Sequence, residues 1–180
     1  MLIEASRSLL LVVDVQERLA AAMEGRDAMV ANTGILMAAA AELAIPAIVS
    51  EQYPQGLGHT VGELTEAAAR AAIHPKLEFS VLRNPAIADR LSGETRDQII
   101  VAGIEAHVCV LQSAFDLKAA GRSVFVGADA VASRRMVSKA TALQRMAADG
   151  IRVVTTEMVV FEWLGAASAP AFKTLSKLIR

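Results

Sequence analysis

The sequence contains little cysteine and few aromatic residues. It has one cysteine, Cys109, in 180 residues, and aromatic residues make up only 4% of the chain. A single cysteine excludes an internal disulfide and a metal site built from several cysteines. Because hydrophobic residues nevertheless reach 54%, alanine and aliphatic side chains must fill the core. A chain of this length fits one domain, which we expect over residues 1–180.

Neither sign of charge is in excess. The 18 basic and 19 acidic residues are well mixed and give a net charge of −1. This balance does not favour contact with a phosphate backbone, so we expect no nucleic-acid partner. The apolar run Leu9–Val13 is too short to span a bilayer and ends at Asp14. Because no basic segment with a cleavage site precedes that run, we expect a cytoplasmic protein with no membrane partner.

Short apolar runs alternate with longer, alanine-rich amphipathic runs along the chain. The short runs are nearly continuous Val, Ile and Leu, which is typical of parallel strands covered on both faces. This alternation indicates an α/β protein with an open, doubly wound sheet. The predicted strands are Ser8–Val13, Ala47–Ser50, Ala72–His74, Gln98–Ala102, Ser123–Gly127 and Ile151–Thr155. The predicted helices are Asp27–Ala44, Thr60–Arg70, Asn84–Leu91, His107–Ala120 and Ser133–Asp149, and the segments Thr156–Leu164 and Pro170–Ile179 complete the chain.

Three chemically active residues follow predicted strands. Asp14 closes the first strand, Lys76 closes the third, and Cys109 follows the fourth after a turn that contains Gly103. Ligands of open α/β sheets bind beyond the carboxyl ends of the strands. We therefore expect these three side chains to share one pocket.

Each of the three residues suits a different task, and together they suggest a cysteine hydrolase. Cys109 is the candidate nucleophile, and its place at a helix start predicts a lowered thiol pKa. Lys76 is a fixed cation that stabilises thiolate and negative charge on the substrate. Asp14 moves protons between the nucleophile, the leaving group and water. Backbone N–H groups around Cys109 would form the oxyanion hole.

Each residue also has an explanation that needs no catalysis. A lone cysteine in an apolar helix is commonly inert core, Asp14 can cap a turn, and Lys76 can be a surface charge. Two further hypotheses for the whole protein remain open at this point. One is a non-catalytic binding or regulatory protein on the same scaffold, and the other is a redox-sensing thiol.

The motifs around these residues resemble those of the isochorismatase-like cysteine hydrolase superfamily. Val12–Gln16 resembles the opening strand motif with its Asp, Pro75–Ser80 resembles the Lys motif, and Gly103–Val110 resembles the cysteine motif. The segments Glu51–Gly58 and Asp129–Arg134 resemble the branch of isochorismatase-domain-containing proteins. The resemblance covers nearly the whole chain.

The resemblance implies a fold and a mechanism. The fold is a three-layer, Rossmann-like sandwich with a six-stranded parallel sheet in the order 3-2-1-4-5-6, in a homo-oligomer that is a dimer or larger. A non-proline cis peptide bond falls at Ile104–Glu105, and the oxyanion amides are those of Glu105 and Cys109. The implied activity is metal-independent hydrolysis of a small amide-like substrate through a thioester, with Asp14, Lys76 and Cys109 as the catalytic triad.

The chain departs from the nicotinamidases of this superfamily. They carry an Asp-x-His pair after the second strand and a later His as a zinc-type site, whereas this chain has Ser50–Tyr53 without the pair. His59 and one Glu make a poor ligand set for a transition metal. We therefore expect no catalytic metal and no cofactor, and a nicotinamidase-type amidase is the second interpretation. No GxGxxG follows the first strand, so the topology does not imply NAD.

Four other residues are candidates for substrate binding. Gln52 follows the second strand, beside the first, and is expected to line the pocket. Tyr53 and Phe79 would supply an apolar wall, although core packing explains them equally well. His107 is expected at the pocket edge rather than in a Cys–His dyad, because residues two apart on a helix point to different sides.

Overall fold

Six parallel strands form the centre of the protein, in the order β3-β2-β1-β4-β5-β6. This computed structural model describes residues 1–179. The strands are β1 (Ser8–Val13), β2 (Ala47–Gln52), β3 (Ala72–Lys76), β4 (Gln98–Ile104), β5 (Ser123–Ala132) and β6 (Arg152–Val154). The predicted parallel sheet and its strand order are confirmed.

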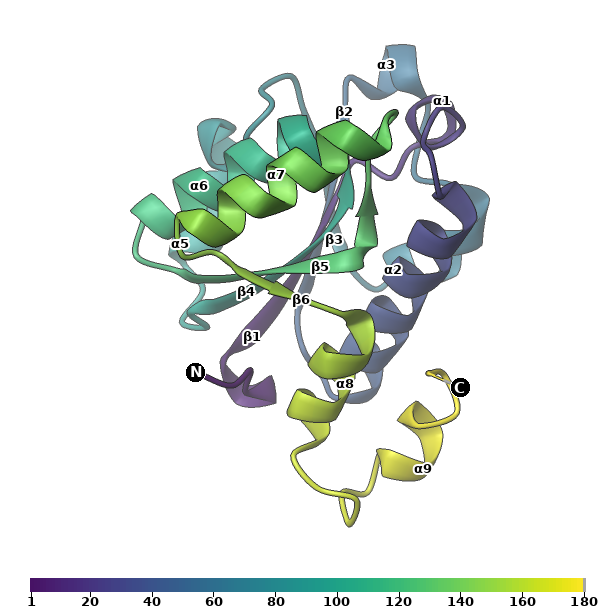
Figure 1. Cartoon of the computed structure of the whole chain (residues 1–180), viewed down its shortest axis with the longest axis vertical. Coiled ribbons are helices and arrows are strands. Elements are labelled where there is room, and N and C mark those ends of the chain that lie inside the picture. Colours follow the sequence, from purple (N-terminus) through teal and green to yellow (C-terminus); the bar gives the residue numbers. More distant parts are fainter. Residues whose placement is uncertain (180) are drawn as a thin grey trace.

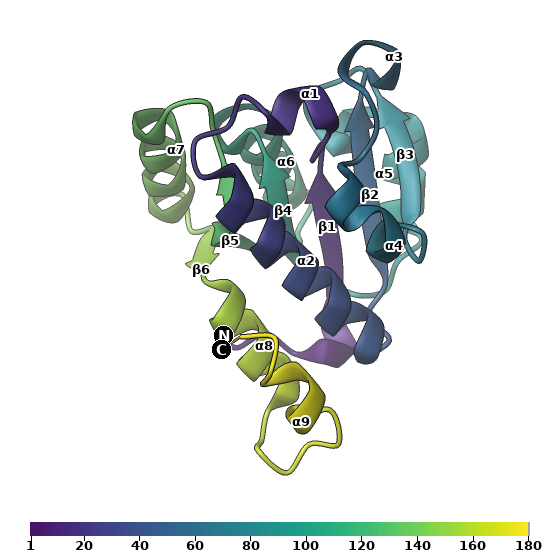
Figure 2. The same cartoon turned by 90° about the vertical axis from the view of Figure 1, so that its right-hand side faces the viewer.

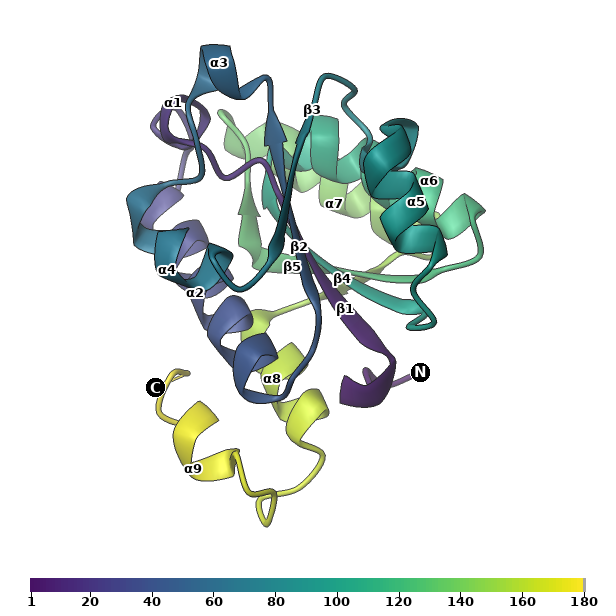
Figure 3. The same cartoon turned by 180° about the vertical axis from the view of Figure 1, so that it is seen from behind.

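Helices cover both faces of the sheet. Figure 1 shows α2 on one side of the strands and α5, α6 and α7 on the other, and Figure 3 shows the same layers from behind. The helices are α1 (Glu17–Ala20), α2 (Arg26–Glu42), α3 (Pro54–Leu57), α4 (Thr65–Ala68), α5 (Pro85–Ser92), α6 (Leu111–Ala119), α7 (Met136–Ala148), α8 (Thr156–Leu164) and α9 (Phe172–Leu175). Figure 2 shows α1 and α3 together at one end of the sheet and both chain termini at the other.

The first strand divides its side chains between two hydrophobic clusters. Leu10 and Val12 join the cluster beneath α2 and α8, whereas Leu9, Leu11 and Val13 join the cluster beneath α5, α6 and α7. All five side chains are fully buried. Burial on both faces is the reason why this strand is a continuous apolar run rather than an alternating one.

Several predicted boundaries are wrong, because they depend on tertiary pairing. The predicted helix over Thr60–Arg70 is reduced to a 3-10 turn and α4, since Thr60 is held in an isolated bridge to Gln16. Strand β4 extends beyond Ala102 because its last residues pair with the second half of β5, after a shift in register. The segment Pro170–Ile179 is helical only over α9. No helix among residues 1–179 combines the length and the apolar character that crossing a membrane requires.

Gly103 lets β1 and β4 approach each other beneath the strand ends. Its φ is +113°, which side-chain-bearing residues rarely adopt. A Cβ at this position would overlap the carbonyl of Val13 and lie 2.7 Å from its backbone nitrogen. The strand that ends at Asp14 therefore packs directly against the segment that leads to Cys109.

We predict that Gly103→Ala disrupts the pairing of β1 with β4. The expected loss of unfolding free energy exceeds about 4 kcal/mol, because the overlap is with backbone that cannot rotate away. Gly121→Ala is the matched control, since its φ is +83° but its Cβ would meet open space, and strain alone should cost about 1–2 kcal/mol. Urea unfolding followed by circular dichroism measures both variants. Equal losses in the two variants would contradict the close approach.

Candidate active site

Asp14 lies immediately beyond β1 and is fully buried. Its backbone has φ of +53°, in the left-handed region, which is uncommon outside glycine and is found at functional sites. Two backbone hydrogen bonds hold it in this conformation. The Asp14 amide donates to the carbonyl of Ser50 at 3.0 Å, and the Gln16 amide donates to the carbonyl of Asp14 at 2.8 Å.

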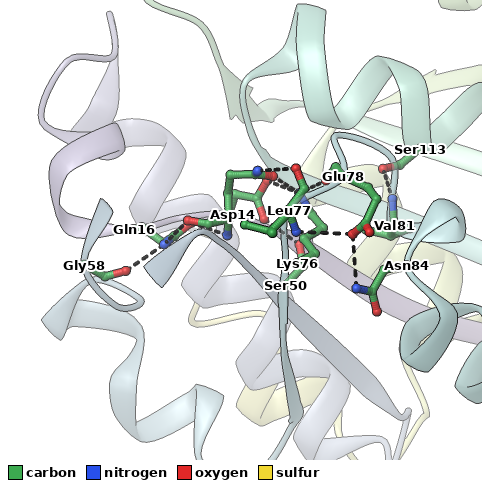
Figure 4. A network of polar contacts seen from close by, with 11 residues as sticks. Asp14, Gln16, Ser50, Gly58, Lys76, Leu77, Glu78, Val81, Asn84 and Ser113 are labelled. Atoms are coloured by element: carbon green, nitrogen blue, oxygen red, sulfur yellow. Dashed lines mark hydrogen bonds and ion pairs between the residues drawn. The ribbon is translucent and has the colours of Figure 1, made fainter. Parts of the chain in front are cut away.

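A buried ion pair joins Asp14 to Lys76, the last residue of β3. The Lys76 Nζ lies 2.7 Å from Asp14 Oδ2, and neither side chain is exposed. The second carboxylate oxygen is also occupied, because the Ser50 hydroxyl donates to Asp14 Oδ1 at 2.7 Å. Figure 4 shows these side chains converging from neighbouring strands. The predicted meeting of Asp14 and Lys76 at the strand ends is therefore observed.

Lys76 uses all three of its ammonium protons within the protein. They are donated to Asp14 Oδ2 at 2.7 Å, to Gln52 Oε1 at 2.7 Å and to the carbonyl of Glu78 at 3.1 Å. An ammonium group has three donors, so none is left for a substrate in this arrangement. Lys76 therefore acts here through its charge. Gln52 is fixed as well, since its Nε2 donates to the carbonyl of Leu77 at 2.7 Å.

Gln16 holds the end of β2 against the segment that follows β1. Its Oε1 accepts from the amide of Gln52 at 2.7 Å, and its Nε2 donates to the carbonyls of Gln52 at 2.9 Å and Gly58 at 2.6 Å. Figure 4 shows Gln16 between these segments. The side chain is fully buried. The sequence analysis did not assign this role to Gln16, although a polar residue two positions after Asp14 is expected near the strand ends.

Cys109 follows β4 in a π-helical turn, Ala106–Val110, that leads into α6. The carbonyl of Glu105 accepts from the amides of Val108 at 3.0 Å and Val110 at 3.2 Å. The peptide bond between Ile104 and Glu105 is cis, the bond at which the family resemblance places it. Only 6% of Cys109 is exposed, and it belongs to the apolar cluster that also contains Val13.

The predicted lowering of the thiol pKa is wrong. Burial, and after it the negative charge of Asp14, raise the pKa of the Cys109 thiol to about 12, although the positive charge of Lys76 opposes the rise. Burial is the largest cause, because it removes the charged thiolate from water. Both charged groups are near enough to act on the ionisation of the thiol. The three predicted residues therefore form one cluster, with the sulfur held as a neutral thiol.

Of the remaining predicted residues, Tyr53 and His107 line different cavities. Tyr53 is 51% exposed and lines a cavity of about 520 Å³ next to Lys76. Phe79 is 54% exposed, so neither aromatic ring is core. His107 Nδ1 lies 3.0 Å from the hydroxyl of Ser133.

Glu105, which follows the cis bond, is nearly buried and anchors the segment before Cys109. Its Oε2 accepts from the backbone amide of Arg134 at 3.1 Å and from Nε of the same residue at 3.0 Å. The loop after β5 is thereby tied to the cysteine segment.

Glu51 and His59 form a separate pair on the other side of β2. The Glu51 carboxylate accepts from the amide and hydroxyl of Thr60, and its Oε2 lies 3.0 Å from His59 Nδ1. Burial acts to raise the pKa of Glu51, but the hydrogen bonds from His59 and Thr60 together lower it. The hydrogen bond to Glu51 raises the pKa of His59. Within residues 1–179, no cluster of three or more His, Cys, Asp or Glu side chains is placed to hold a metal ion.

Comparisons with known proteins agree with these motifs. A model of the isochorismatase domain matches residues 8–158. The chain is 38% identical over 167 residues to isochorismatase domain-containing protein 1 of Salmo salar. The aligned region covers 93% of this chain but only 59% of the length of the Salmo salar protein. It is 36% identical over 172 residues to isochorismatase domain-containing protein 2 of Danio rerio, and the aligned region covers 96% of this chain and 86% of the Danio rerio protein.

The fold agrees as closely. A structure described as MAR1 ribonuclease from Caenorhabditis elegans superposes with a TM-score of 0.93 at 38% identity, over 99% of this chain and 92% of that one. The family model spans most of the chain, and these relatives are similar over nearly its whole length. The chain therefore belongs to the isochorismatase family.

Proposed function

We propose that this protein is a metal-independent hydrolase of a small amide-like substrate, with Cys109 as the nucleophile. Membership of the family supports hydrolase chemistry in general. The observation that carries the finer proposal is the buried Asp14–Lys76 ion pair beside a thiol whose pKa responds to both charges. A base and a cation next to a nucleophilic sulfur are the groups that thiol-dependent acyl transfer requires.

In the first half of the reaction, Asp14 takes the proton from Cys109 as the sulfur attacks the substrate carbonyl carbon. The resulting oxyanion accepts hydrogen bonds from the amides of Glu105 and Cys109. The C–N bond then breaks, and Asp14 gives its proton to the leaving amine. The product of this half is a thioester on Cys109 and a free amine.

In the second half, water attacks the thioester. Asp14 removes a proton from the water as the C–O bond forms, and the C–S bond breaks to release a carboxylic acid. The proton returns to the sulfur, which restores the neutral thiol. Lys76 stays cationic throughout and stabilises negative charge near Asp14 and the sulfur.

The raised pKa of Cys109 favours a mechanism in which a base removes the thiol proton during attack over one in which a thiolate is already present. With a pKa of about 12, only about one Cys109 in ten thousand is ionised near pH 8. The adjacent carboxylate supplies what the thiol lacks, because it takes the proton at the moment of attack. This is why Asp14 is assigned the role of base and Lys76 an electrostatic one.

Three alternatives compete with this proposal. The C. elegans relative is described as a ribonuclease, but a net charge of −1 gives this chain little attraction for a phosphate backbone. A non-catalytic binding protein on the same fold predicts no turnover of any amide and partner binding that survives Cys109→Ser. A nicotinamidase-type amidase is the remaining alternative, and nicotinamide belongs among the amides that are tested.

We predict that Cys109→Ala abolishes both covalent trapping and amide turnover. Wild-type protein should gain the mass of a small aldehyde, and turnover in the variant should fall by roughly 10³-fold or more, as for other lost nucleophiles. Intact-mass spectrometry measures the adduct, and release of amine or ammonia from a panel of small amides measures turnover. Cleavage of one RNA, followed by electrophoresis, tests the ribonuclease alternative. Ser92→Ala, at an exposed position at the end of α5, serves as the control. An adduct that persists without Cys109 would refute its role as nucleophile.

A second prediction concerns the ionisation of Cys109. Burial disfavours the thiolate, so the rate of alkylation by iodoacetamide should still be rising with pH above pH 9 in the wild type. Lys76→Met removes the cation that lowers the thiol pKa, so alkylation should slow. Asp14→Asn removes an anion that raises the thiol pKa, so alkylation should quicken even though turnover is lost. Thiolate ultraviolet absorbance gives an independent titration, because no other cysteine contributes. A plateau below pH 8 would contradict the neutral resting thiol.

The expected homo-oligomer also stays a prediction. Its support is the group of large apolar side chains exposed near the strand ends, Tyr53, Leu77 and Phe79. Light scattering measures the subunit number, and a monomer at micromolar concentration would contradict the prediction.

A further inference from the structure

Strand β2 supplies a neutral partner to each member of the buried ion pair. It lies between β1 and β3 in the sheet, so it separates the strand that leads to Asp14 from the strand that ends in Lys76. Ser50 and Gln52 are two residues apart and therefore face the same side. Ser50 donates to Asp14, and Gln52 accepts from Lys76.

The Ser50 hydroxyl has no competing task among the described contacts. It is fully buried, and its one proton is donated to Asp14 Oδ1 at 2.7 Å. Lys76 holds the other oxygen, Oδ2, at the same distance. A carboxylate bonded at both oxygens cannot rotate without breaking one of these bonds. Since Ser50 is fully buried, bulk water does not compete with its hydroxyl for the carboxylate.

We propose that Ser50 is a positioning residue that holds the Asp14 carboxylate in one orientation for proton transfer from Cys109. The proposal rests on the function proposed above, because it assumes that Asp14 is the base. Ser50 acts through Asp14 and does not itself touch the substrate. A hydrogen bond from a hydroxyl favours the ionised carboxylate over the protonated form, because the protonated oxygen is a weaker acceptor.

Other charged and titratable groups near Asp14 can also contribute to the pH dependence of activity. Lys76 faces Asp14 from β3, and Cys109 faces it from the π-helical turn. His74 is in register with Ser50 on β3, and its Nε2 is buried without a partner in the described part of the chain. Glu51 alternates to the opposite face of β2, where it binds His59 and Thr60. Removal of the Ser50 hydroxyl leaves all of these groups in place.

The test compares Ser50→Ala with Ser113→Ala. Ser113 is also fully buried, but its oxygen accepts from the backbone amide of Val81 rather than binding a catalytic group. In Ser50→Ala the acidic limb of the kcat profile should move up by about one to two pH units, and kcat at neutral pH should fall about 10-fold with KM unchanged. Ser113→Ala should leave the limb in place. Ser50→Thr, which keeps a hydroxyl, should restore it, and Ser50→Gly replaces the alanine variant if that variant does not fold.

A second measurement needs no turnover. Carbon NMR of the Asp14 carboxyl, labelled in wild type and in both alanine variants, follows its protonation directly. An upward shift of the titration midpoint in Ser50→Ala alone supports the positioning role, even if no amide is turned over and the proposed activity fails. Turnover with the same acidic limb and the same NMR midpoint in wild type and Ser50→Ala overturns the role of Ser50 and leaves the proposed activity standing.

Discussion

The buried contact between Asp14 and Lys76 is the interaction around which the site is built. Neither side chain is exposed, and burying two charges costs more than their mutual attraction returns unless further hydrogen bonds complete the shell. Those hydrogen bonds are present, because Ser50 donates to the carboxylate and Gln52 accepts from the ammonium group. Its members come from the ends of adjacent parallel strands, so the order of the sheet decides which groups can meet. Loss of either charged partner would leave the other buried and uncompensated, so each single substitution should lower the stability of the fold.

The Cys109 thiol beside this pair is neutral. Burial and the Asp14 anion both raise the thiol pKa, and Lys76 only partly offsets them. A neutral thiol is a poor target for oxidants, since susceptibility follows thiolate character and exposure. This weakens the hypothesis of a redox-sensing thiol. In the proposed mechanism Asp14 has two linked effects, because the charge that disfavours the thiolate at rest belongs to the group that would remove the thiol proton during attack.

Close backbone packing and side-chain hydrogen bonds fix the segments that carry Asp14, Lys76 and Cys109. Gly103 brings β4 against β1, and Gln16 joins the residues after β1 to the end of β2. Asp14 itself adopts a left-handed conformation, which surrounding hydrogen bonds maintain. The segment before Cys109 is tied through Glu105 to Arg134. The reactive groups thus lie on short segments that are fixed at both ends by strands or by side-chain hydrogen bonds.

The sequence by itself determined the fold class, and it predicted that Asp14, Lys76 and Cys109 would lie near one another. Continuous apolar runs such as Leu9–Val13 predict buried parallel strands, and polar residues that close such runs must gather at one edge of the sheet. What the sequence did not reveal is how those positions are completed. Three features depend on which strands are neighbours and in what register. They are the hydrogen bond from Ser50 to Asp14, the hydrogen bond from Lys76 to Gln52 and the extension of β4 to Ile104. The thiol pKa was misjudged for a related reason. A helix start is visible in the sequence, whereas burial and the placement of two opposite charges exist only once the strands and helices have packed.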